Sequence, residues 1–442
     1  MEMNNGANLP ATKASKLLTL ALALLAVIYL LQMASPLRLG SDSLVLLNIG
    51  ASVADGHGFL YHGTPTHFPS GYPAMVALLN HLGLASSWSF ILMNCAFLGV
   101  ALGACYSFYR NPLNLSPALA IGLCCLITLS YVLVKHVTLP MSDVPFLGVF
   151  TLAVLSLSRI RDQEEKMKWK WLLLALFLTA TAITVRTAGV ALLPAFAWVL
   201  GLPLLSGFDE FRKKHPAVLW GSLFGLVLFG LVTGCFISKT QYFAEMKSVY
   251  FQDGVSGRLL KNLIGHTTEI GEIAINVPAA KAPALMKPII PLAGVPLIGL
   301  ICRGVWLRRR VFGVLEIVLL TYGSLIFVWP WVDARFWLPA LPLLTGFAAV
   351  ALVDAAKTQI FKFTEIALFV WFVAAGLAAL TYSTRISWSG NRFAEVYGDG
   401  SLRPTYRAAF AGQTNGVVNS DAMVLLKRYD TRTQNALTHN GI

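Results

Sequence analysis

Charged side chains are scarce in this sequence, and their scarcity excludes most classes of protein. Only 12% of the 442 residues are charged, whereas 56% are hydrophobic. A soluble domain has roughly a quarter of its residues charged, and a disordered chain has few apolar residues. The composition therefore predicts a chain that is embedded in a membrane.

Cysteine and glycine patterns also exclude several kinds of site. The six cysteines lie within or at the end of apolar runs and lack zinc-ligand spacing, so we interpret them as small buried hydrophobic residues. His57, His62 and His67 share one segment, but their spacing fits no zinc template. No glycine-rich phosphate loop or dinucleotide fingerprint is present. The sequence thus supports no cofactor, and a divalent metal ion is compatible with it but unsupported.

Long apolar runs predict an all-α membrane protein with about eleven transmembrane helices, since a span takes about 20 residues. The expected spans are residues 17–35, 87–108, 115–134, 144–158, 171–186, 187–206, 217–237, 289–306, 313–329, 338–354 and 364–382. The fifth and sixth together would form a helix about 54 Å long, which is far longer than a bilayer core of about 30 Å. We therefore predict a break at Arg186.

The basic residues predict the orientation, because Lys and Arg collect in short cytoplasmic loops. With the N-terminus in the cytoplasm, the basic clusters fall inside: Lys13 and Lys16; Arg110; residues 159–170; residues 212–214; residues 303–310; Lys357 and Lys362. Topology therefore accounts for much of the net charge of +13 without a nucleic-acid partner.

Three longer segments fall outside: residues 36–86, residues 238–288 and the tail. We divide the chain into a transmembrane module, residues 1–382, and a small extracytoplasmic C-terminal segment, residues 383–442. The first outer segment is expected to contain amphipathic helices, because apolar residues recur there at helical spacing after Ser41.

Two aspartates stand at predicted helix starts on the outer side. Asp42 lies at or near the start of the first amphipathic helix, and Asp143 directly precedes an apolar helix. Both fit helix N-caps, and for Asp143 alone this is the simpler interpretation. The alternative is a carboxylate that takes a proton from a hydroxyl at the membrane surface. Lys135 and His136 are close enough in sequence to be counter-charges of Asp143.

Two arginines occupy positions where a charge is costly. Arg186 interrupts the fifth and sixth spans, so it either pairs with an acid or binds an anion. Arg335 lies among Trp329, Trp331 and Trp337, which are typical of an aromatic belt at the membrane interface. Asp333 is a candidate partner for Arg335, but an arginine is also suited to bidentate binding of phosphate. Acids and cations together suit transfer of a group from a lipid phosphate, which needs a base and a stabilised leaving group.

Four segments resemble the C-type glycosyltransferase superfamily, whose members use polyprenyl-phosphate sugars and include protein O-mannosyltransferases and the lipid A aminoarabinose transferase. The segments are SDSLVLLNIGASVADGHGF with FPSGYPAMVALL, LPMSDVPFLGVFTLAVLSLSR, ALFLTATAITVRTAGVALLPA, and WPWVDARFWLPALPLL. They follow one another in the family's order over residues 40–345. Ser43 and Ser70 depart from the family pattern, which has a second acid and a proline at these positions.

The resemblance implies a role for each matching residue. Asp42 would be the catalytic base, and Asp143 a second catalytic acid that supports donor or acceptor binding. The residues that would bind the donor phosphate or the substrate are Arg186, Arg335, Lys135, His136 and Tyr72.

The implied reaction moves a sugar from a polyprenyl-phosphate donor to a hydroxyl of a lipid, glycan or protein acceptor, by one inverting displacement on the extracytoplasmic face. A bacterial plasma membrane is the expected location, with the C-terminus outside. A transporter or flippase of lipid-linked glycans is an alternative, although the lack of an internal repeat counts against it. A polymerase or ligase of such glycans is another.

Overall fold

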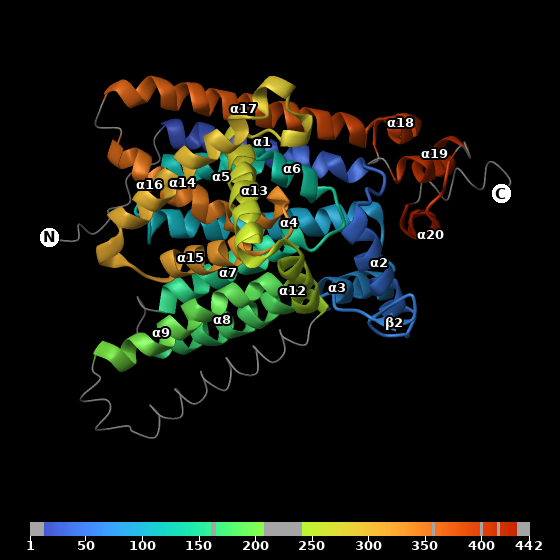
Figure 1. Cartoon of the computed structure of the whole chain (residues 1–442), viewed down its shortest axis with the longest axis horizontal. Coiled ribbons are helices and arrows are strands. Elements are labelled where there is room, and N and C mark those ends of the chain that lie inside the picture. The colour runs from blue at the N-terminus through green and yellow to red at the C-terminus, as the bar shows by residue number, and fades with distance from the viewer. Residues whose placement is uncertain are drawn as a thin grey trace.

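The computed structural model describes residues 13–160, 165–206, 241–355, 359–397, 401–412 and 416–430. These residues form a bundle of helices (Figure 1). Within the described ranges the only strands are β1 (Leu60–Tyr61) and β2 (Thr64–Pro65), which pair as a small antiparallel hairpin. The predicted all-α class is therefore confirmed.

Six helical segments are long and apolar enough to cross a membrane. They are built from α1 (Lys13–Leu31) with η1 (Gln32–Ala34), α4 (Ser87–Arg110), α7 (Asp143–Ile160), η4 (Ala284–Met286) with α14 (Ile289–Leu307), η6 (Ala334–Ala340) with α16 (Leu341–Ala355), and the later part of α17 (Gln359–Ser387). A seventh span arises if α5 (Pro117–Leu129) and α6 (Tyr131–Val137), which meet at a 60° bend, are counted together. All of these coincide with expected spans.

Three further expected spans coincide with shorter apolar helices, namely α8 (Glu165–Val185), α9 (Leu193–Ser206) and α15 (Val314–Val328). The span expected over 217–237 lies outside the described residues. The structure thus supports six or seven full crossings, and the higher count stays a prediction.

The predicted break at Arg186 is confirmed. α8 ends at Val185, Arg186 is extended at φ −149° and ψ 137°, and η2 (Thr187–Leu192) leads into α9. A Cβ on Gly189 would lie 2.6 Å from the carbonyl carbon of Ala182, so glycine lets η2 turn back against the end of α8. The turn leaves Arg186 at a helix end rather than inside an apolar helix.

Helix α7 forms the centre of the bundle. It is packed between α4 and α8, and most of its residues are buried. A Cβ on Gly148 would lie 2.7 Å from the carbonyl oxygen of Phe97, so α4 and α7 touch backbone to backbone. Because α7 begins at Asp143, this carboxylate stands at the edge of the core.

A second close crossing joins α13 (Val255–Ile275) to α14; α13 follows α12 (Gln241–Asp253). A Cβ on Gly271 would lie 1.8 Å from the carbonyl oxygen of Ile290, and one on Gly294 would lie 2.2 Å from that of Thr267. Two backbones this close leave no room for a side chain. The crossing therefore fixes α13 against the bundle.

We expect Gly294→Ala to lower the thermal midpoint of the detergent-solubilised protein, because the added methyl group overlaps the Thr267 carbonyl and overpacking costs about 1–3 kcal/mol or more. Gly299→Ala on the same helix is the control, since no atom lies within 4 Å of a Cβ there. Equal midpoints for the two variants would contradict the close crossing.

The segment over residues 36–86 and the C-terminal segment pack together. The first contributes α2 (Ser41–Ala54) and α3 (Gly71–His81), and the tail contributes α18 (Phe393–Val396), α19 (Arg403–Ala411) and α20 (Ser420–Tyr429). Their apolar side chains form a hydrophobic cluster of their own that includes Leu47, Val76 and Leu425. We call this end of the bundle, at the right of Figure 1, the α2 end.

Polar contacts hold the tail on the first segment. Arg428 binds Asp55 in a bidentate pair at 2.8 and 2.9 Å, and this hydrogen bonding holds the pKa of Asp55 below its usual value. The Leu37 N–H donates to the buried carboxylate of Asp430 at 2.7 Å. The C-terminal segment is therefore docked beside the helix that carries Asp42.

Candidate active site

Four charged residues from distant segments meet at the α2 end. Asp42 lies in the first turn of α2, and Asp143 is the first residue of α7. Arg186 lies at the break after α8, and Arg335 lies in η6. Each belongs to the terminus of an element or to a short 3-10 turn, where side chains can converge without interrupting a long helix.

Asp143 and Arg186 form an ion pair in which Arg186 Nη1 donates to Asp143 Oδ1. The Asp143 side chain is 1% exposed and that of Arg186 17%. A carboxylate this deeply buried requires a partner, because removing one member of such a pair leaves an uncompensated charge. The structure therefore gives Asp143 a structural task as well as any chemical one.

Asp143 forms its ion pair with Arg186, which follows α8, rather than with a neighbour in sequence. His136 is buried beside Asp143, but its Nδ1 lies 2.6 Å from the carbonyl oxygen of Val132 in its own helix. Lys135 is exposed, and the described ranges offer its ammonium group no ion-pair partner.

Arg335 lies between two carboxylates. Its Nη2 is 2.9 Å from Asp42 Oδ2, and its Nε is 3.2 Å from Asp333 Oδ2. Asp333 also caps η6, since its Oδ1 accepts from the Arg335 N–H at 3.0 Å. The pairing with Asp333 was predicted, whereas sequence reasoning did not find the pairing with Asp42. Asp333 belongs to the same short segment as Arg335, whereas Asp42 comes from α2. The Asp42 side chain is 35% exposed.

One aromatic ring lies near both arginines. The Phe336 ring centroid is 5.6 Å from the guanidinium carbon of Arg186 and 5.2 Å from that of Arg335. Cation–π attraction favours both placements. Two cations thus face one small region, each neutralised by carboxylates of the chain itself.

Tyr72, at the start of α3, borders the same region. Its side chain is fully buried, and its hydroxyl has no hydrogen-bond partner in the part of the chain that the structure describes. Burial raises its pKa well above the usual value, with the Asp143 charge adding to the shift. The hydroxyl therefore stays neutral and has an unused donor, which a polar ligand group could fill.

The aromatic residues around Arg335 differ partly from the prediction. Trp329 and Trp331 are half-buried, and their ring centroids lie 5.0 Å apart with the rings tilted by 54°, which fits an interfacial pair. Trp337, however, is 2% exposed and packs in the core, so its assignment to an interface belt was wrong. Its indole N–H finds a buried acceptor in Glu269, which keeps a polar group satisfied there.

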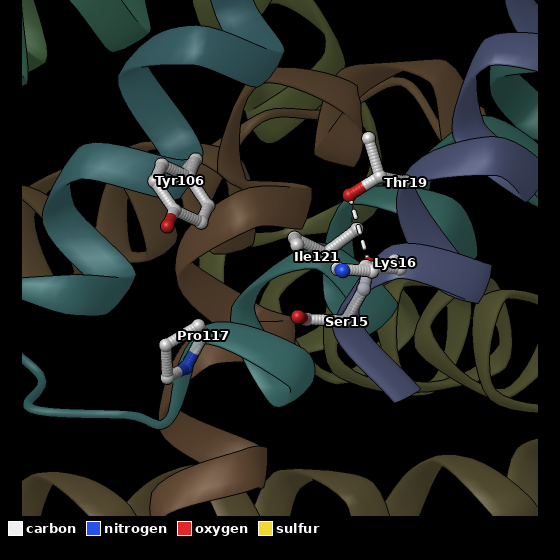
Figure 2. A pocket seen from close by; sticks show the side chains of 6 residues that line it. All are labelled: Ser15, Lys16, Thr19, Tyr106, Pro117 and Ile121. Atoms are coloured by element: carbon white, nitrogen blue, oxygen red, sulfur yellow. Dashed lines mark hydrogen bonds between the residues drawn. The ribbon is translucent and has the colours of Figure 1, made fainter. Parts of the chain in front are cut away.

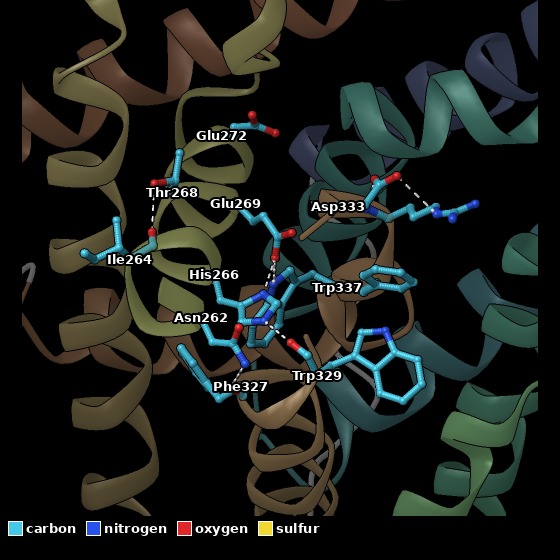
Figure 3. Close-up of polar contacts among 12 residues, drawn as sticks. Asn262, Ile264, His266, Thr268, Glu269, Glu272, Phe327, Trp329, Asp333 and Trp337 are labelled. Carbon is cyan, nitrogen blue, oxygen red and sulfur yellow. Dashed lines mark hydrogen bonds and ion pairs between the residues drawn. The ribbon is translucent and has the colours of Figure 1, made fainter. Parts of the chain in front are cut away.

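Sequence reasoning missed Glu269 and its neighbour His266, which lie on α13 and reach the segment that carries Arg335 (Figure 3). Their spacing of three residues on an amphipathic helix puts them on one face, which is the only local signal. That signal did not indicate which segment they would contact.

A surface cavity lies away from the charged cluster. It has a volume of about 400 Å³ and is lined by Ser15, Lys16, Thr19, Tyr106, Pro117 and Ile121 (Figure 2). These residues come from the start of α1, the end of α4 and the start of α5, which is the end of the bundle opposite the α2 end. The cavity and the charged cluster are therefore separate features. Within the described ranges, no three His, Cys, Asp or Glu residues gather as metal ligands.

Comparison with known proteins agrees with this geometry. Residues 67–234 match the family model described as dolichyl-phosphate-mannose-protein mannosyltransferase. The structure resembles ArnT from Cupriavidus metallidurans bound to undecaprenyl phosphate, with a TM-score of 0.50 at 13% identity over 94% of this chain and 73% of that chain. It resembles apo ArnT from the same organism equally well, at 14% identity and with the same TM-score and coverage.

No curated protein matches the chain. The likeness to the solved structures establishes the fold, and the family match covers α3 to the region beyond α9, including Asp143 and Arg186. Both agree with the resemblance inferred from the sequence, which is thereby confirmed. The chain thus has the multi-pass membrane fold of a C-type glycosyltransferase, and residues 67–234 match a glycosyltransferase family model.

Proposed function

We propose that this glycosyltransferase moves a sugar from a polyprenyl-phosphate donor to an acceptor hydroxyl at the α2 end of the bundle. The observation that carries the proposal is the meeting of Arg186 and Arg335 beside Phe336, with Asp42 partly exposed next to them. Undecaprenyl phosphate bound to a protein of the same fold supports a lipid phosphate as the donor class.

The two guanidinium groups would hold the donor phosphate. Planar guanidinium groups bind phosphate oxygens with paired hydrogen bonds and remain charged at any physiological pH. Because the arginines already face carboxylates, the phosphate has to replace one of them. Asp143 is 1% exposed, and Asp333, although 40% exposed, is held by its cap on η6. Asp42, which is 35% exposed and comes from another element, is therefore the partner that can move.

Displacement of Asp42 from Arg335 would create the catalytic base. The freed carboxylate takes the proton of the acceptor hydroxyl as the acceptor oxygen attacks the anomeric carbon. The bond from the anomeric carbon to the phosphate oxygen breaks, and its electron pair leaves with the polyprenyl phosphate, whose charge the arginines stabilise. One displacement inverts the configuration at the anomeric carbon.

The remaining predicted residues would have supporting tasks. Asp143 holds Arg186 in place through their ion pair, and Tyr72 offers its unused hydroxyl. His136 would line the site beside Asp143, and Lys135 would add positive charge at this end of the bundle. Under this proposal the α2 end faces the extracytoplasmic side of a bacterial inner membrane, with the N-terminus in the cytoplasm. The acceptor is a lipid, glycan or protein hydroxyl.

The proposal is tested with purified protein in nanodiscs, using undecaprenyl phosphate as the binding probe, and with membranes of cells that have or lack the protein. We expect undecaprenyl phosphate to bind, and cells without the protein to accumulate a polyprenyl-phosphate sugar while one surface glycan loses a sugar by mass spectrometry. A flippase would instead move lipid-linked sugar across proteoliposomes with no change in its covalent structure, and that result would overturn the proposal.

A further inference from the structure

The segment that carries Arg335 is fastened at two points to one face of α13. Residues 329–337 lie in the connection between α15 and α16. At one end His266 Nε2 lies 3.1 Å from the carbonyl oxygen of Trp329, and at the other the Trp337 indole Nε1–H donates to Glu269 Oε2 at 2.8 Å (Figure 3). Arg335 lies between these two points.

The two fastening residues are joined to each other. His266 Nδ1 lies 2.6 Å from Glu269 Oε2, and their side chains are 0% and 3% exposed. Because the Trp329 carbonyl oxygen can only accept, His266 Nε2 is the donor in that hydrogen bond, and Nδ1 faces the Glu269 carboxyl group. The ring is thus held on both of its nitrogens.

Aromatic packing makes these residues one unit. The His266 ring lies edge-on to Phe327 at 5.8 Å and to Trp337 at 6.3 Å, and Phe327 and Trp337 are 5.5 Å apart. The close α13–α14 crossing at Gly271 anchors this part of α13. The face of α13 therefore has little freedom to move relative to the core.

Burial of the Glu269 carboxyl group costs free energy of folding. Its Oε1 is buried with no hydrogen-bond partner among the residues that the structure describes. Only the contacts of Oε2 therefore offset the cost of removing the carboxyl group from water. An arrangement of this kind contributes orientation more than stability. The element it orients is η6, which contains both Trp337 and Arg335.

We propose that Glu269 is a positioning residue for the donor phosphate. It holds Trp337 directly and Trp329 through His266, and these two contacts fix the position of Arg335 between them. This inference rests on the proposed function. Glu269 binds Trp337 and His266 rather than Arg335 or Asp42, so its effect on the reaction passes through the segment 329–337.

The test is a double-mutant cycle, since residues that act through one group show non-additive effects. Glu269→Gln and Trp337→Phe are each made alone and together with Arg335→Ala. Trp337→Phe removes the indole N–H that binds Glu269 and keeps an aromatic ring. It therefore tests the same contact if Glu269→Gln does not fold. Folded protein is quantified by size exclusion for every variant, and kcat/KM for the donor and the affinity for undecaprenyl phosphate are measured.

We expect each single substitution to lower kcat/KM for the donor about tenfold to a hundredfold, the range that follows from a small misplacement of a binding group. In the Arg335→Ala background the same substitutions should change the affinity less than twofold. Glu272→Gln is the matched control, because Glu272 lies one turn further along α13 and binds Tyr131 and the Ala279 N–H instead of η6. It should leave the donor parameters unchanged.

Folded Glu269→Gln or Trp337→Phe with wild-type kcat/KM, or effects that multiply with that of Arg335→Ala, would overturn the positioning role. That result is distinct from failure of the proposed function, which would appear as a wild-type protein without transfer.

Discussion

Asp42→Asn is expected to lower sugar transfer by about two to four orders of magnitude, the usual contribution of a general base, while the affinity for undecaprenyl phosphate does not fall. The amide cannot take the acceptor proton. It also carries no charge, so the donor phosphate no longer competes with a carboxylate at 2.9 Å for Arg335. Transfer and donor affinity are measured on the same nanodisc preparation.

Asp55→Asn is the matched control for this prediction. Asp55 caps the other end of the same helix, α2, and binds Arg428 rather than Arg335. We expect it to keep near-wild-type transfer. Asp42→Asn with near-normal transfer would show that another group is the base, and weaker donor binding in that variant would contradict the competition for Arg335.

Variants of the Asp143–Arg186 pair can distinguish its effect on protein stability from its effect on donor binding. Arg186→Gln alone is expected to cost about 3–5 kcal/mol of stability, because it leaves a buried carboxylate without its cation. The double variant Asp143→Asn with Arg186→Gln removes both charges and replaces them with amides that can hydrogen bond to each other. It should recover most of the stability and still bind undecaprenyl phosphate poorly.

Thermal unfolding in detergent and donor affinity are the two measurements for this pair. Asp143→Asn alone is the companion variant, since it keeps the guanidinium group and removes only the buried negative charge. Wild-type donor affinity in the stable double variant would exclude Arg186 as a phosphate ligand. An unstable double variant would show that the site needs the ion pair itself.

The sequence predicted which residues form the charged cluster, but not which of them pair with each other. The apolar runs and the cost of Arg186 at membrane depth predicted the break after α8, because length and charge act locally along the chain. The four resembling segments predicted that Asp42, Asp143, Arg186 and Arg335 would share one end of the bundle. None of these signals paired the residues, since Asp42 and Arg335 are far apart in sequence and only packing brings them together.

Other features had no sequence signal strong enough to find them. Trp337 looks like its neighbours Trp329 and Trp331 in sequence, and only its contact with Glu269 distinguishes a core indole from an interfacial one. Likewise, the 60° bend between α5 and α6 falls in a continuous apolar run. Such features depend on long-range contacts, which periodicity does not encode.

The carboxylate partners of the two arginines have a consequence for how a charged lipid would enter. Under the proposed function, both arginines are paired with carboxylates of the chain when no donor is bound. Lipid tails next to the α2 end therefore meet ion pairs rather than unpaired cations, which lowers the electrostatic cost of that contact. Donor binding is then an anion exchange at Arg335, in which one negative group arrives as another departs. The departing group is Asp42, so the same event that loads the donor also releases the base.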